Sequence, residues 1–137
     1  MACHSVSPMQ TETDAITATI LNASIELHRE LGPGLLESVY EHVLAAELIR
    51  RGFHVERQKP VTFSFRGMHF SEAFKPDLLV NNQVVVEIKS LEKLSPVHSK
   101  QLLTYLRLLD LRVGLLLNFG AATLREGIHR VVNGYVD

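Results

Sequence analysis

The sequence predicts a single α/β domain with a central mixed β-sheet flanked by helices. Apolar residues recur at helical spacing before residue 32, short β-rich runs fill residues 54–89, and a further helix then separates two strongly apolar strands. The chain has 137 residues, of which 46% are hydrophobic and 21% charged, which suits one ordinary globular domain with a sizeable core.

Two helices are expected before the strands. The first begins near Asp14, which can cap a helix, and ends before the Gly-Pro-Gly at residues 32–34. The second covers about residues 35–51. We therefore expect residues 1–13 to form a flexible N-terminal arm and residues 14–137 to form the folded domain.

The remaining pattern indicates strands and one more helix. Strands are expected at residues 54–58, 61–65, 68–74, 77–80, 84–89, 113–119 and 128–132, and a helix at about residues 97–111. Because that helix connects two strands, a right-handed crossover should make the strands at 84–89 and 113–119 parallel.

Three charged residues interrupt strands that are otherwise nearly all apolar, within the segment KPDLLVNNQVVVEIKS. They are Asp77, Glu87 and Lys89. A buried charge is costly unless it is paired or bound to a cation. Glu87 and Lys89 are two residues apart, so both project from one face of their strand.

The turn between the two strands decides whether Asp77 joins them. A two-residue turn at Asn81-Asn82 would set Asp77 opposite Val86, with its side chain on the other face from that of Glu87. A three-residue loop or a bulge would set Asp77 directly opposite Glu87, with the two Cβ atoms about 5 Å apart. We predict the second register.

Two carboxylates at that separation repel each other, and a divalent cation removes the conflict. Oxygen ligands without a nearby cysteine favour Mg²⁺ or Mn²⁺, which can activate a water molecule for attack on phosphorus. Lys89 should stay protonated and stabilise the transition state. The alternative is a buried structural ion pair between Glu87 and Lys89, with Asp77 as a turn residue.

Two helices offer further candidate residues. Glu37, Tyr40 and Glu41 share a face of the second helix, where Glu37 is a candidate third carboxylate for the metal. Gln101 and Tyr105 share a face of the later helix and are candidates for positioning substrate. From spacing alone, a solvated helix position is favoured for Glu41 and narrowly for Glu37. Spacing alone likewise favours a polar stripe on an amphipathic helix for Gln101 and Tyr105.

Charge, cysteine content and the distribution of apolar residues indicate the cellular environment of the protein. The formal net charge of −1 provides no general positive field for nucleic acid. The single Cys3 allows no internal disulfide, and we find neither a signal segment nor an apolar run long enough for a membrane span. We therefore expect a cytoplasmic protein that is not inserted in a membrane.

The ordered motifs resemble a known family. GLLESVY is similar to the signature of the GxxExxY family within the PD-(D/E)XK nuclease-like superfamily. The likeness continues through KPDLLV, VVVEIKS, the helix with Gln101 and Tyr105, and VGLLLNFG. It implies a restriction-endonuclease-like core in which Asp77, Glu87 and Lys89 form the D…ExK triad and Glu37 is the helical acid.

The resemblance implies a Mg²⁺-dependent (or Mn²⁺-dependent) nuclease that hydrolyses DNA or RNA. Glu37, Asp77 and Glu87 would bind metal, Lys89 would stabilise the transition state, and Gln101 and Tyr105 would position substrate. Alternatives are a non-catalytic module that binds nucleic acid or protein, and a hydrolase of a small phosphodiester. Because the domain is small for gripping a duplex alone, a homodimer or a partner protein is compatible with this function.

Overall fold

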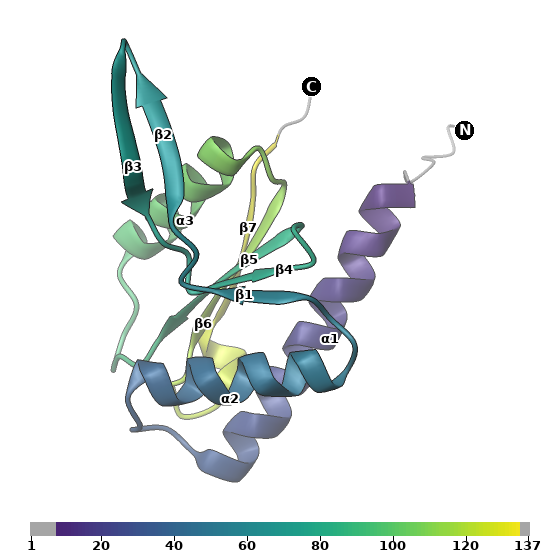
Figure 1. The fold of residues 1–137 in the computed structure, drawn as a ribbon. Helices are drawn as coiled ribbons and strands as arrows, with labels where there is room; N and C mark the ends of the chain where they lie inside the picture. Colours follow the sequence, from purple (N-terminus) through teal and green to yellow (C-terminus); the bar gives the residue numbers. More distant parts are fainter. Residues whose placement is uncertain (1–7, 135–137) are drawn as a thin grey trace, which may run out of the picture.

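A five-stranded mixed sheet forms the centre of the structure, a computed structural model that describes residues 8–134 (Figure 1). In spatial order its strands are β1 (Val55–Arg57), β4 (Leu78–Val80), β5 (Val84–Lys89), β6 (Val113–Asn118) and β7 (Ile128–Val132). β5 and β6 pair in parallel and the other neighbours pair antiparallel. The predicted mixed sheet and its parallel crossover are therefore confirmed.

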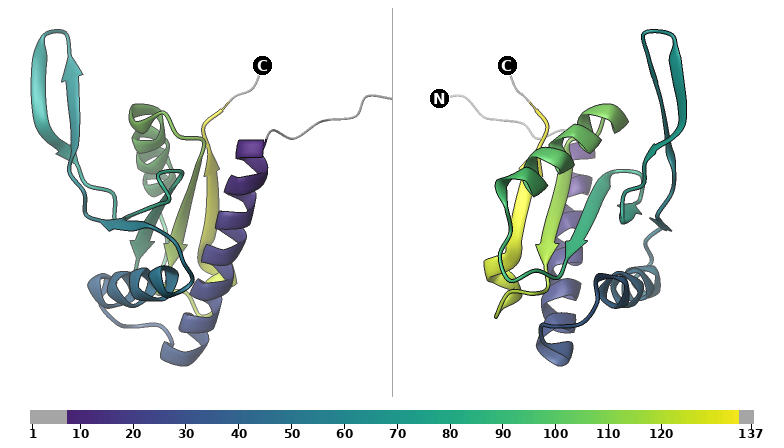
Figure 2. Two further views of the ribbon diagram at one scale, coloured as in Figure 1. Left: turned by 45° about the vertical axis from the view of Figure 1, so that its right-hand side comes forward. Right: turned by 90° about the vertical axis from the view of Figure 1, so that its left-hand side faces the viewer.

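Helices cover both faces of this sheet (Figure 2). α1 (Pro8–Leu31) and α2 (Glu37–Arg50) pack on one face, and α3 (Pro96–Leu109) packs on the other. A short 3₁₀ helix, η1 (Leu124–Gly127), precedes β7. Ser95 caps α3, since its hydroxyl accepts from the Val97 N–H and the His98 ring completes a capping box.

Alternation along β5 assigns each side chain to one of the two faces. Val84, Val86 and Ile88 belong to the core beneath α1 and α2, whereas Val85 packs with Leu102 of α3. Because side chains alternate along a strand, Glu87 and Lys89 share the α3 face with Val85. A carboxylate and an ammonium therefore lie at the end of the apolar layer beneath α3.

The start of α1 corrects a predicted boundary. The helix begins at Pro8 and not near Asp14, so residues 8–13, expected to belong to a flexible arm, are helical. Thr13 is buried and donates to the Gln83 side chain at 2.7 Å, which anchors this extra turn to the β4–β5 loop. Residues 1–7 of the expected arm lie outside the described residues. No helix in the described part has the length and apolar character needed to span a bilayer.

Two strands stand apart from the central sheet. β2 (Val61–Phe65) and β3 (Met68–Phe74) form a separate hairpin that projects beside α3 (Figures 1 and 2). Its turn lies at Arg66-Gly67, as predicted, with φ values of 49° and 81°. The strands were expected within the single mixed sheet, but they pair only with each other.

The chain after β5 is held against the chain after β6. The buried Asn118 side chain accepts from the Leu91 N–H at 2.9 Å and donates to the Leu91 carbonyl at 3.0 Å. At Gly120 the two segments approach so closely that an added Cβ would lie 2.2 Å from the Leu91 carbonyl oxygen. This contact fixes the position of the segment that follows Lys89.

Gly120→Ala should therefore lower the free energy of unfolding by about 1–3 kcal/mol or more, because backbone atoms would have to move. Urea denaturation measures the change, and Ala122→Ser in the same exposed turn is the matched control. A Gly120→Ala variant as stable as the parent would show that the two segments do not touch in solution.

Candidate active site

A three-residue loop connects β4 to β5. Val80 pairs with Val84 and Leu78 pairs with Val86, so residues 81–83 form the loop. Asn81 and Asn82 both have left-handed φ values, 50° and 54°. Continuing this register by one residue sets Asp77 opposite Glu87, and the predicted register is confirmed.

Main-chain hydrogen bonds hold the two carboxylates in place. The Asp77 N–H donates to Glu87 Oε2 at 2.7 Å, and the Ile88 N–H donates to Asp77 Oδ2 at 2.8 Å. Each acid is therefore fixed by backbone of the opposite strand. Glu87 Oε1 accepts no hydrogen bond from any residue in 8–134, although the side chain is only 6% exposed.

The electrostatics of Glu87 reflect this burial. The pKa of its carboxyl is raised from 4.5 to about 8. Burial is the largest cause and the nearby Asp77 carboxylate adds to it, whereas the Asp77 N–H and Lys89 act in the opposite direction. Among the described residues Lys89 forms no ion pair. The alternative, a structural salt bridge between Glu87 and Lys89, is therefore absent from the described residues.

The side chain of Gln58 links a third carboxylate, that of Glu41, to Asp77. Glu41 of α2 is 7% exposed and accepts from the Gln58 amide at 2.8 Å, while the same amide donates to Asp77 Oδ1 at 2.9 Å. Arg57 forms an ion pair with Glu41 at 3.1 Å. A solvated position for Glu41 is thus wrong, because the residue lies on the buried stripe of α2.

Sequence reasoning missed Gln58 and underestimated Glu41. The signal for Glu41 was its spacing from Leu44 and Leu48, which places it on the apolar face of the helix. Nothing in the sequence around Gln58 indicates a role for it in the site. It adopts a left-handed φ of 52°, and its N–H donates to the carbonyls of Pro76 and Asp77, both at 3.1 Å.

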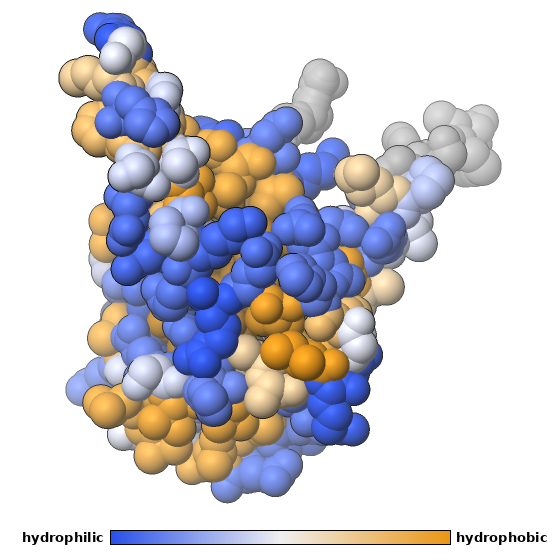
Figure 3. Space-filling model, viewed as in Figure 1, coloured by the Kyte–Doolittle hydropathy of each residue, from blue (hydrophilic) through white to orange (hydrophobic). Residues whose placement is uncertain are grey.

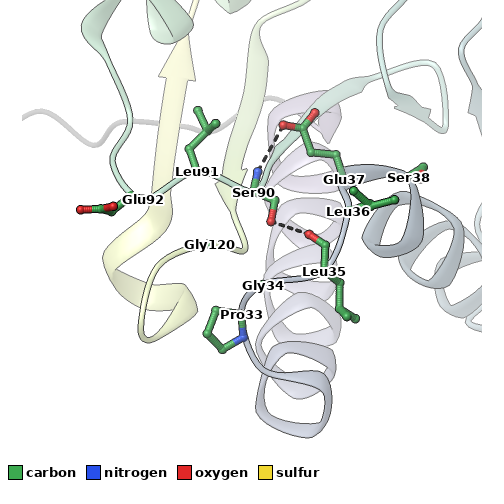
Figure 4. Close-up of a pocket in the computed structure, with 10 residues that line it drawn as sticks. All are labelled: Pro33, Gly34, Leu35, Leu36, Glu37, Ser38, Ser90, Leu91, Glu92 and Gly120. Carbon is green, nitrogen blue, oxygen red and sulfur yellow. Dashed lines mark hydrogen bonds between the residues drawn. The ribbon is translucent and has the colours of Figure 1, made fainter.

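Glu37 lies at the edge of this site. It is exposed at the start of α2, and its carboxylate accepts from the Ser90 N–H at 3.3 Å (Figure 4). The Ser90 hydroxyl donates to the Leu35 carbonyl at 2.6 Å. These residues line an open cavity of about 690 Å³ that begins next to Lys89 and does not extend over Asp77 and Glu87.

The α3 candidates lie on the same side of the sheet as the carboxylates. The Tyr105 ring stacks on Phe74 with centroids 4.2 Å apart. Burial, followed by the Glu87 and Asp77 carboxylates, raises the pKa of the Tyr105 phenol. Gln101 is exposed one turn earlier on the helix. Both candidates thus lie on the helix that covers the carboxylate face of the sheet, and Tyr105 is the less exposed of the two.

The oxygen ligands suit a hard divalent cation. The unpartnered Glu87 Oε1 is a buried acceptor next to a second carboxylate, which is the setting in which Mg²⁺ or Mn²⁺ removes repulsion. No three Asp, Glu, His or Cys side chains in residues 8–134 converge as a ready metal centre. The Gln58 amide lies between Glu41 and Asp77 and keeps these two acids apart.

Fold and site together define an α/β domain in which a buried glutamate, Glu87, lies opposite the partly buried Asp77, with a lysine on the same strand. A family model described as the PD-(D/E)XK nuclease superfamily matches residues 14–131, and the chain belongs to that superfamily. The mixed sheet flanked by helices is consistent with the restriction-endonuclease-like fold. The closer likeness to the GxxExxY family stays a prediction. Comparison with curated proteins and with solved structures found no match.

The raised pKa of Glu87 predicts a pH dependence of stability without metal. Between pH 4.5 and about 8 the folded protein retains a proton that the unfolded chain has released. The free energy of unfolding should therefore fall as pH rises through this window, by up to about 1.4 kcal/mol per pH unit. Denaturation in EDTA should show this slope for the parent and a flatter one for Glu87→Gln. Equal slopes would contradict the burial of Glu87.

The Gln58 bridge predicts a second stability effect. Gln58→Ala removes the donor shared by Glu41 and Asp77 and should cost about 1–3 kcal/mol in EDTA. Arg66→Ala is the matched control, because Arg66 has a similar φ of 49° without a carboxylate partner. If both substitutions cost the same in thermal melts, the effect comes from the left-handed backbone and not from the amide.

Proposed function

We propose that this protein is a metal-dependent nuclease that hydrolyses a phosphodiester bond of DNA or RNA with water as the nucleophile. The observation that carries the proposal is the fixed Asp77–Glu87 pair with Lys89 on the same face of β5. Membership of the PD-(D/E)XK nuclease superfamily supports the reaction class.

In this proposal Asp77 and Glu87 hold one Mg²⁺ or Mn²⁺ ion. When bound, such an ion neutralises the two carboxylates and makes a coordinated water molecule more acidic. Asp77 and Glu87 enter the site already positioned by main-chain hydrogen bonds, so little reorganisation is needed when charge develops.

The other residues act on the substrate. Lys89 places a positive charge, unpaired in the described structure, where negative charge builds up on the phosphoryl oxygens. Tyr105 and Gln101 position the strand that carries the scissile phosphate. Water forms the new P–O bond, the bond to the leaving sugar oxygen breaks, and the products are a phosphomonoester and a hydroxyl.

The third carboxylate has two candidates one turn apart on α2. Glu37 remains the proposed ligand because it lies against Ser90, directly after Lys89. Glu41 competes for the role because the Gln58 amide links it to Asp77. Mn²⁺ calorimetry separates the two, since only loss of the true ligand, in Glu37→Gln or Glu41→Gln, should weaken binding markedly.

The central test combines metal binding with cleavage. Mn²⁺ should release or absorb heat with the parent protein and not with Asp77→Ala. Lys89→Ala should keep metal binding but slow cleavage of labelled DNA or RNA about a hundredfold or more. Lys93→Ala, which removes a charge from an exposed position nearby, is the matched control.

Two results would replace the proposal by another function. Absence of metal binding, together with retained binding of nucleic acid or protein, would identify a non-catalytic module. Turnover of a small chromogenic phosphodiester without any cleavage of oligonucleotides would identify a small-molecule hydrolase.

A further inference from the structure

The β2–β3 hairpin has one apolar face. Phe63 pairs with Phe70 and Phe65 pairs with Met68 across the two strands. Because paired residues and alternate residues of a hairpin share a face, these four side chains lie together. The ring of Phe63 lies 6.1 Å from that of Phe65 and 6.4 Å from that of Phe70.

No described segment covers this face towards the tip. Phe65 is 47%, Met68 53% and Phe70 46% exposed. Figure 3 shows hydrophobic side chains on the projecting hairpin below hydrophilic residues at its tip. A two-stranded hairpin gains little stability by itself, so a projecting row of half-exposed aromatic rings indicates a binding surface.

The base of the same face reaches the candidate active site. Phe74 pairs with Val61, which alternates with Phe63 on β2, across a register shift in β3, and its ring stacks on Tyr105 at 4.2 Å. Tyr105 in turn lies within the field of Glu87 and Asp77. Aromatic side chains therefore extend from α3, which covers the carboxylate face of the sheet, to the end of the hairpin.

The hairpin carries one acid, and it is paired with a lysine. From Val61 to Phe74 the charged residues are Arg66 and Glu72, and Glu72 forms an ion pair with Lys75 at 3.2 Å. At the turn, the Arg66 guanidinium lies 5.0 Å from the centre of the Phe65 ring. The whole chain has a net charge of −1, so phosphate attraction alone is weak, and stacking on aromatic rings is the additional source of affinity that the hairpin provides.

Unpaired bases fit this surface better than the alternatives. A double helix hides the faces of its bases in the stack, whereas an unpaired base presents a π-face to an aromatic side chain. A second copy of the chain fits poorly, because three half-exposed side chains fall well short of the roughly 800 Å² per partner that a stable dimer buries.

We propose that the hairpin is a stacking platform for unpaired nucleotides, so that the preferred substrate is single-stranded or carries a single-stranded tail. The strand contacts Arg66 through its phosphates, stacks on Phe65 and Phe70, and reaches the carboxylate pair past Tyr105. This inference rests on the proposed nuclease function and specifies its substrate.

Fluorescence anisotropy in EDTA tests the platform without turnover, using the full chain at one fixed salt concentration. A labelled oligothymidylate should bind more tightly than a blunt duplex of equal length. Phe65→Ala and Phe70→Ala should each weaken binding of the single strand about tenfold. Phe65→Tyr should retain binding, whereas Phe65→Leu, which keeps apolar volume without a π-face, should not.

Ser64→Ala is the matched control, because Ser64 is exposed and alternates with Phe63 and Phe65, which places it on the opposite face of the hairpin. Circular dichroism melts exclude variants that do not fold, and Phe65→Tyr keeps the test valid if an alanine variant fails. Equal affinity of the phenylalanine variants and the parent would overturn the proposal. So would a dimer that Phe65→Ala converts to a monomer in sedimentation, because the face would then bind a second copy.

The result is separable from the proposed function. Stacking measured in EDTA does not require Asp77, Glu87 or Lys89 to act on the substrate. Single-strand binding that depends on Phe65, without cleavage under any metal condition, would retain the platform and reject the nuclease. Cleavage with no effect of Phe65 or Phe70 on binding would reject the platform alone.

Discussion

The candidate site depends on two hydrogen bonds that cross from the entry of β4 to β5. The Asp77 N–H binds the Glu87 carboxylate at 2.7 Å and the Ile88 N–H binds the Asp77 carboxylate at 2.8 Å. β4 begins only at Leu78, so at this level side-chain oxygens replace the carbonyls that would continue the ladder. The ladder between β4 and β5 ends next to the two acids. Main-chain N–H groups therefore set the spacing between the carboxylates of Asp77 and Glu87.

Burial of Glu87 determines what the site favours chemically. A charged carboxylate that is 6% exposed is unfavourable, and the rise in the pKa of Glu87 to about 8 expresses that cost. The apolar layers on both faces of β5 stabilise the strand that carries it. The fold therefore holds an acid that favours a proton or a cation, next to a lysine that can meet an anion.

Periodicity was sufficient to predict the helices, the strand order around α3 and the parallel crossover, because these depend on local pattern and short connections. The register was harder, since Asn81 and Asn82 allow either loop length and only the electrostatic requirement of the acids favoured the longer one. Gln58 was beyond prediction because its role depends on where β1 ends relative to β4. Glu41 was assigned to solvent because spacing was read without the neighbouring leucines.

Gln58 also connects the β2–β3 hairpin to the carboxylates of the candidate active site. It is the residue between β1 and the hairpin segment, and its N–H donates to the carbonyls of Pro76 and Asp77, where the chain leaves the hairpin. Its amide binds Asp77 again and Glu41 as well. The two ends of the hairpin are therefore tied together at the carboxylates. The residue that follows β1 at the start of the hairpin segment therefore also fixes the Asp77 carboxylate, so the hairpin and the acid pair share one anchor.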